Sequence, residues 1–269
     1  MNWEELSSDD FPQAVQEAQG VCVVPLSVVE RHGHHLPTGT DLLIGRELCR
    51  RAAALEPVIV FPDLIFTQIL EARHAPGAIA LDADLIVRLL DNVCREIARN
   101  GLQKIVLVSA HGGNYHFTRF FAQAQLAGPR DYVVYVADPY LPPEEEASLA
   151  ALWETTVDGH GGEHETSEIL AIRPDLVRLD RAPADGEGLP LDRLKALNES
   201  GVYTGIWWYA DHPTHYRGDG RPATAEKGHR LLDAHAQALA RTVAAIKRDD
   251  VTPQLQREFY AAGERPGQV

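Results

Sequence analysis

The chain has 269 residues, of which 45% are hydrophobic, and its 25 Lys and Arg against 39 Asp and Glu leave a formal net charge of -14. A chain of this length and composition can bury a core without disulfides, which excludes extensive disorder. Its negative charge repels both nucleic-acid phosphates and anionic bilayers. We therefore expect no nucleic-acid partner and no membrane partner.

Residues 1–20 are acidic and lack the basic and apolar regions of a signal peptide. No apolar run approaches the ~18 residues that span a bilayer, so we expect a soluble, cytoplasmic protein. Cys22, Cys49 and Cys94 contain no C-x-x-C pair, and we expect them to be buried free thiols. Any metal must then be held by His and carboxylate side chains.

Short apolar runs along the chain are typical of strands buried on both faces. In chain order they are Val21–Leu26, Val58–Phe61, Lys104–Ser109 and Tyr132–Val136. Amphipathic spacing predicts a helix from Asp41, with Thr40 or Asp41 as its N-cap. Further predicted helices are Ala83–Ile97, Phe117–Leu126 and Ala225–Ile246.

Strands that alternate with helices predict an α/β fold, a three-layer α/β/α sandwich with a mainly parallel central sheet. No repeat or linker divides the sequence, so we predict a single domain over residues 1–269, with its core at 21–247 and short extensions. Ligands of such sheets bind beyond the carboxyl ends of the strands. The polar segments at these ends are therefore the candidates for a functional site.

A histidine-rich segment follows the first predicted strand. Glu30, His32 and His34 are two residues apart, so in extended backbone they point to the same side and could converge with Asp41. Imidazole and carboxylate ligands suit Zn, Mn or Fe(II), and a carboxylate can bridge two ions. The alternative is that the histidines face water and Asp41 only caps the next helix.

The turn His111–Asn114 contains two glycines directly after the third apolar run. Glycines allow a tight strand-to-helix turn whose backbone approaches a ligand closely, and the helix N-terminus behind it favours an anion. This turn would present His111 at the functional edge of the sheet. The alternative is a glycine-rich connection with an incidental histidine.

A third polar segment, residues 158–167, leads into another apolar-periodic helix. Glu163 and Glu165 lie at or just before its start, where the helix dipole keeps a carboxylate ionised for metal binding. His160, in a glycine turn, is a candidate acid or base because His titrates near neutral pH. The alternative is a capping arrangement with Thr166 or Ser167 as N-cap. Together, the three segments predict a metal centre.

These segments and the run Ala-Thr-Ala-Glu-Lys-Gly at 223–228 occur in the order and spacing of the creatininase family of metal-dependent amidohydrolases. The chain resembles this family from about Val21 to the final helix. The resemblance implies the three-layer fold and two divalent metal ions per subunit, with Zn first and Mn or Fe as alternatives. It also implies a homo-oligomer, often a hexamer, and a small-molecule amide substrate.

The resemblance also implies a role for each site residue. The implied metal ligands are Glu30 and His111 for one ion, His32 for the other, Asp41 as the bridge, and Glu163 as a further ligand with Glu165 behind it. The exchange of Glu163 and Glu165 is left open. His160 would protonate the leaving nitrogen, and Asn114 or the amides of the glycine turn would bind the oxyanion.

The chain departs from the creatinine-hydrolysing branch of the family at two positions. Gly113 stands where that branch has a carboxylate ligand, and Thr156 stands where it has a substrate-packing Trp. This difference favours an amide other than creatinine. The ligand missing at Gly113 could come from Glu163.

Aromatic side chains gather in residues 203–221. Trp207, Trp208 and Tyr209, together with Glu71 and His74 after the second strand, are the predicted substrate contacts. Flat apolar walls with polar tips suit a planar heterocycle or an amide side group. The alternative is an oligomer interface, where aromatic residues are also enriched.

The leading hypothesis is a hydrolase of C–N bonds other than peptide bonds, in which a hydroxide activated by two metals attacks a small cyclic or linear amide. The alternatives are a creatinine amidohydrolase proper, a peptidase of the mycofactocin type, and a metal-binding homologue without activity. A barrel amidohydrolase would need more strand–helix units than follow Val136.

Overall fold

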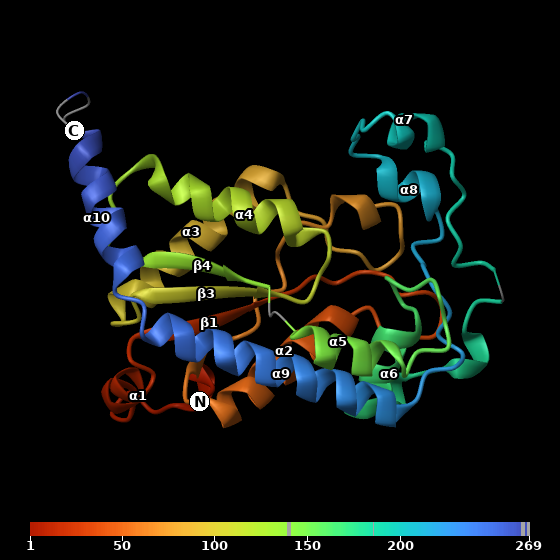
Figure 1. The fold of residues 1–269 in the computed structure, drawn as a ribbon, viewed down its shortest axis with the longest axis horizontal. Coiled ribbons are helices and arrows are strands. Elements are labelled where there is room, and N and C mark those ends of the chain that lie inside the picture. The colour runs from red at the N-terminus through yellow and green to blue at the C-terminus, as the bar shows by residue number, and fades with distance from the viewer. Residues whose placement is uncertain (139–140, 185, 265–266, 268–269) are drawn as a thin grey trace.

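A computed structural model describes residues 1–138, 141–184, 186–264 and 267, so the last positions of the predicted C-terminal extension lie outside the described residues. In this part of the chain a four-stranded sheet lies at the centre (Figure 1). Its order is β2 (Ile59–Val60), β1 (Val21–Leu26), β3 (Lys104–Ser109) and β4 (Val133–Ala137). Each neighbouring pair is parallel, which confirms the predicted α/β fold with a parallel sheet.

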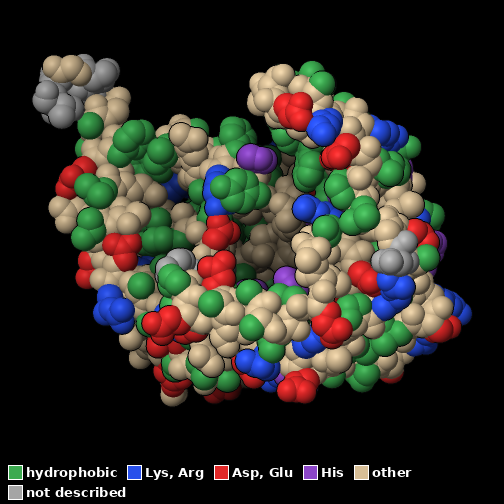
Figure 2. Space-filling model, turned by 45° about the vertical axis from the view of Figure 1, so that its right-hand side comes forward, with side chains coloured by type: hydrophobic (Ala, Val, Ile, Leu, Met, Phe, Trp, Pro, Cys, Tyr) green, Lys and Arg blue, Asp and Glu red, His purple; other side chains and the backbone are tan. Residues whose placement is uncertain are grey.

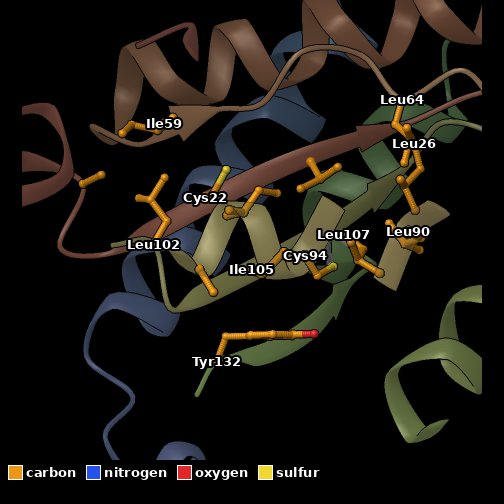
Figure 3. Packing of buried hydrophobic residues seen from close by; sticks show 14 of the residues in the cluster. Cys22, Leu26, Ile59, Leu64, Leu90, Cys94, Leu102, Ile105, Leu107 and Tyr132 are labelled. Atoms are coloured by element: carbon orange, nitrogen blue, oxygen red, sulfur yellow. The ribbon is translucent and has the colours of Figure 1, made fainter. Parts of the chain in front are cut away.

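One face of the sheet is covered by α1 (Phe11–Glu17), α3 (Ala83–Arg99) and α4 (Asn114–Ala124). Because side chains alternate along a strand, every second residue of β1 points to this face. Cys22 and Leu26 of β1 pack there with Leu90 and Cys94 of α3, as Figure 3 shows.

The opposite face is covered by α2 (Thr40–Leu55) and α9 (Ala225–Lys247). Val21 and Val23 of β1 pack with Cys49 of α2 and Leu239 of α9. Helices therefore cover both faces of the sheet, and the three layers are visible in Figure 1. Cys22, Cys49 and Cys94 are buried and free, as predicted.

The remaining helices lie around this core. They are α5 (Pro143–Ala150), α6 (Glu163–Ile172), α7 (Lys195–Glu199), α8 (Trp207–Asp211) and α10 (Val251–Gly263). The helix α6 packs against α2 and α9, whereas α7 and α8 stand apart from the sheet at the upper right of Figure 1. No helix of the described ranges is both long enough and apolar enough to cross a bilayer.

Several predicted element boundaries were wrong. The second strand is limited to two residues, and α4 begins at Asn114 instead of Phe117. The helix α4 starts early because the glycine turn continues directly into it. The backbone N–H of Asn114 donates to the His111 carbonyl at 3.2 Å. The N-cap of α2 is Gly39, so the predicted caps Thr40 and Asp41 lie inside that helix. The helix α6 starts at Glu163, so Thr166 and Ser167, the caps of the alternative interpretation, lie inside it.

Candidate metal centre

Polar side chains from four parts of the chain meet beyond the carboxyl ends of β1 and β3. Glu30 and His32 follow β1, Asp41 lies in the first turn of α2, His111 follows β3, and Glu165 lies in the first turn of α6. The parallel pairing of β1 and β3 brings their carboxyl ends to the same edge of the sheet. The helix α6 approaches this edge because it packs on α2. Figure 2 shows the hollow in the surface at which His side chains are visible.

Glu30, Asp41 and His111 form a first group of possible metal ligands, all of them buried. The Nδ1 atom of His111 lies 2.8 Å from Oε1 of Glu30 and 3.2 Å from Oδ2 of Asp41. Two carboxylates and one imidazole nitrogen thus point at one another in the protein interior.

His32 and Glu165, with His160 above them, form a second group beside the first. The Nε2 atom of His32 lies 2.9 Å from Oδ1 of Asp41 and 3.6 Å from Oε2 of Glu165. Asp41 therefore directs one carboxylate oxygen to each group. This is the arrangement expected of a carboxylate that bridges two ions.

The donor atoms in this cluster fit a cation. Within the described residues, Oε1 of Glu30 and Oδ2 of Asp41 are buried and make no hydrogen bond, although both lie close to Nδ1 of His111. A buried carboxylate oxygen without a hydrogen bond is unfavourable because its charge has lost the solvation of water. Divalent ions would supply the missing partners, and the mixture of imidazole and carboxylate ligands suits Zn, Mn or Fe(II).

Burial and neighbouring charges shift the pKa values of His32 and Glu165 in this cluster. Burial alone would lower the pKa of His32, but the carboxylates of Asp41 and Glu165 raise it to about 10. Burial raises the pKa of Glu165 to about 7, although the nearby His32 opposes this change. Without a metal, His32 is therefore protonated at neutral pH, and a metal ion would have to displace that proton.

His160 lies in the glycine-containing segment 159–162 before α6 and contacts His32 of the cluster. Its ring centroid lies 4.1 Å from that of His32, and its Nε2–H donates to the carbonyl of Arg31 at 2.7 Å. Burial and the neighbouring His32 hold the pKa of His160 well below its usual value. The imidazole is therefore neutral at pH 7, with its Nδ1 atom left as a proton acceptor.

A model of the creatininase family, described as creatinine amidohydrolase, matches residues 4–243. The chain belongs to the creatininase family. It is 29% identical to the creatinine amidohydrolase of Pseudomonas putida, over 66% of this chain and 74% of that protein. It is also 29% identical to the mycofactocin precursor peptide peptidase of Mycobacterium ulcerans (strain Agy99), over 78% of this chain and 79% of that protein. A solved structure named Creatininase Mn shares the fold, with a TM-score of 0.74 and 24% identity over 92% of this chain and 99% of that one.

Glu163, the predicted further ligand, lies outside the candidate metal cluster of this creatininase-family chain. Its carboxylate pairs with Lys227 of α9 and accepts hydrogen bonds from the amide of Thr155 at 2.9 Å and its hydroxyl at 2.8 Å. Glu165 takes the place in the cluster instead. Residues two apart on a helix point about 200° apart, so only one of the two glutamates can face the cluster.

Two other predicted residues point away from the site. His34 is exposed, with its Nε2 atom 2.7 Å from the guanidinium of Arg31. The alternation predicted from Glu30 fails because Gly33 has a φ of 63° and turns the chain back. The amide of Asn114 is fully buried, donates to Thr67 and Ser109, and accepts from the backbone of Gln68. Of the two predicted oxyanion donors, only the glycine turn lines the metal pocket.

The predicted substrate residues surround two neighbouring hollows that share lining residues. A pocket of about 230 Å³ lies over the metal cluster, and a groove of about 1040 Å³ lies beside it. Glu71 and Trp207 line both spaces, whereas His74 and Tyr209 line only the groove. Trp208 lines the pocket but is almost completely buried.

The sequence places His215 in the aromatic segment but predicts no role for it in the metal centre. Its Nδ1 atom accepts a hydrogen bond from the indole of Trp208 at 2.8 Å, and its Nε2 atom contacts Oε2 of Glu30. This pairing orients Glu30 so that its other oxygen, Oε1, faces His111. The contact joins residues 185 positions apart, and no local pattern in the sequence indicates it.

Proposed function

We propose that this creatininase-family chain is a metal-dependent amidohydrolase that cleaves a C–N amide bond with two divalent ions. The observation that supports this proposal is the cluster of candidate ligands in which Asp41 directs one oxygen to His32 and the other to His111. A solvated surface would need no such concentration of carboxylates and imidazoles in the interior. The groups also lie at the edge of the sheet where α/β folds bind their ligands.

In this proposal Glu30, Asp41 and His111 would hold one ion, and His32, Asp41 and Glu165 would hold the other. Zinc is our first candidate, and manganese and iron accept the same ligands. Bound there, two ions make water nucleophilic at neutral pH and polarise the amide carbonyl. His215 would keep Glu30 in place through its contact with Oε2.

His160 is the proton carrier of the proposed reaction. Its Nε2–H is held by the Arg31 carbonyl, so Nδ1 can accept a proton from the attacking water and return it to the leaving nitrogen. Without this proton the nitrogen would depart as a poor anionic leaving group. The amides of the glycine turn at Gly112 and Gly113 line the pocket and could bind the developing oxyanion.

The groove supports a substrate larger than a creatinine-sized amide. The amide would enter the pocket, and the rest of the substrate would lie in the groove against Tyr209 and Trp207. A short peptide is therefore the second candidate substrate, in agreement with the peptidase among the relatives. Trp207 and Tyr209 are exposed in the single chain, so we also propose that a second subunit of a homo-oligomer packs here and completes the groove, with a hexamer as the predicted assembly.

Metal analysis combined with a panel of formamides, lactams, creatinine and short peptides tests the proposal. We expect the zinc-loaded chain to hydrolyse at least one class and His32→Ala to lose both metal and turnover. His34→Ala is the matched control, because this histidine belongs to the same segment but faces solvent. It should keep both metal and turnover.

Two outcomes would contradict the proposed function. Hydrolysis that survives in His32→Ala would show that the cluster is not the catalytic site. Full zinc occupancy of the wild-type chain without hydrolysis of any class in the panel would instead favour a metal-binding homologue that has lost catalysis.

A further inference from the structure

The two ring nitrogens of His111 face different groups. Nδ1 points into the cluster, at Glu30 and Asp41. Nε2 points the other way, and lies 3.3 Å from Oε1 of Glu71. A histidine that binds metal through one nitrogen carries its proton on the other, and that N–H is usually held by a carboxylate, a carbonyl or a water.

Glu71 is itself held in this position. Its second oxygen, Oε2, accepts a hydrogen bond from the side-chain amide of Gln68 at 2.9 Å. The same amide donates to the carbonyl of Gly113 at 3.1 Å, and the backbone N–H of Gln68 donates to Asn114 at 3.2 Å. The buried Asn114 therefore fixes the segment that carries Glu71 against the turn that carries His111.

Gly113 leaves the space that Glu71 occupies. A Cβ atom at this position would lie 1.9 Å from Oε1 of Glu71 and 2.4 Å from Nε2 of His111. The φ angle of Gly113 is -62°, which any residue can adopt. Glycine is thus needed here for the absence of a side chain and not for backbone freedom.

We propose that Glu71 is a positioning residue of the metal centre: it accepts the Nε2–H of His111 and so directs the Nδ1 lone pair to the metal. Gly113 provides the space for this contact. The inference rests on the metal centre of the proposed function, and replaces the substrate contact that the sequence predicts for Glu71. Glu71 also lines both the pocket and the groove.

Zinc affinity, measured by competition with a chromophoric chelator in the absence of substrate, tests this role. We expect Glu71→Ala to bind zinc about 10- to 100-fold more weakly, the usual effect of removing a partner of this kind. Glu71→Gln, which keeps an acceptor of the same size, should recover part of the loss. Arg73→Ala is the matched control from the same segment, because this residue is exposed, and it should bind zinc as the wild type does.

A double-mutant cycle separates this contact from other effects. Gly113→Ala displaces Glu71 and also crowds Nε2 of His111, so we expect it to weaken zinc binding more than Glu71→Ala does. Adding Glu71→Ala to it should then cost nothing more. Nitrogen-detected NMR of the zinc-loaded wild type should show His111 as the Nε2–H tautomer. Circular dichroism of the metal-free variants should match the wild type, which excludes unfolding as the cause.

The outcomes distinguish the two proposals. Zinc affinity in Glu71→Ala equal to that of the wild type, with a raised KM alone, would make Glu71 a substrate contact and overturn the inference while leaving the amidohydrolase intact. Additive losses in the double mutant, or an Nδ1–H tautomer of His111, would also overturn it. A wild-type chain that binds no zinc, manganese or iron would overturn the metal centre and this inference together.

Discussion

Glu163→Gln removes one charge from a buried contact between α6 and α9. The carboxylate is fully buried and pairs with Lys227, whose side chain is 13% exposed. It also accepts from the backbone N–H groups of Glu154 at 3.0 Å and Thr155 at 2.9 Å. A glutamine keeps the shape but turns a donor N–H toward groups that are themselves donors.

The expected cost follows from these contacts. Removing one partner of a buried ion pair costs about 3 to 5 kcal/mol, and because Lys227 keeps Glu154 and the Pro222 carbonyl as partners we expect about 3 kcal/mol. At about 2 to 4 °C per kcal/mol, this loss corresponds to a fall in Tm of about 6 to 12 °C. Glu154→Gln is the matched control: its side chain is 69% exposed, and the loss of an exposed pair should cost below about 1 kcal/mol.

The cost should also depend on pH. Although burial alone would raise the pKa of Glu163, its hydrogen bonds with Lys227 and Thr155 hold it below its usual value. Such a group stabilises the fold above its unfolded pKa, and this contribution is lost as the pH falls through the lower folded pKa. The stability difference between wild type and Glu163→Gln should therefore be full at pH 7 and shrink below about pH 4.

Urea denaturation of both variants measures the free energy of unfolding, and metal analysis of the folded proteins measures zinc content. We expect Glu163→Gln to be less stable than the wild type but to bind zinc with the same stoichiometry. A variant with unchanged stability and a missing zinc ion would place Glu163 among the metal ligands and refute this reasoning.

Three further predictions concern the proton carrier, the metal ligands and the packing of α9. His160→Ala should keep its zinc and lose about 10²- to 10⁴-fold in kcat, as measured by metal analysis and turnover, because it removes only the proton carrier; loss of zinc would make His160 a ligand. Zinc binding at pH 7 should release protons, since the neighbouring carboxylates raise the pKa of His32 to about 10. Affinity should then increase from pH 6 to pH 9, and calorimetry in buffers of different ionisation enthalpy that shows no proton release would contradict this. Gly228→Ala should destabilise the fold by about 1 to 3 kcal/mol in urea, because its Cβ would lie 1.9 Å from the Ser167 carbonyl oxygen. Gly128→Ala is its control, because an added Cβ there would have no atom within 4 Å and the φ of -170° is extended. Equal stability of the two variants would show that α6 and α9 can move apart.

Local patterns were sufficient to predict the layers of this protein. Continuous apolar runs such as Val21–Leu26 indicate strands buried on both faces, and helix periodicity between them indicates crossovers. Three of the proposed metal ligands were also predictable from local rules, because Glu30 and His32 lie in the segment after one strand and His111 lies after another. Parallel strands bring such positions to one edge of the sheet whatever the rest of the chain does.

Contacts between distant segments decided the rest of the site. The choice between Glu163 and Glu165 depends on Lys227, which lies 64 positions from Glu163 and holds that side chain away from the cluster. The partners of the proposed ligands also depend on contacts between distant segments. Glu71, for example, contacts His111 across 40 positions. Sequence spacing defines which side chains share a strand end or a helix turn. It carries no information on which distant side chain will occupy the space beside them, and only the packed structure determines which atom faces the metal.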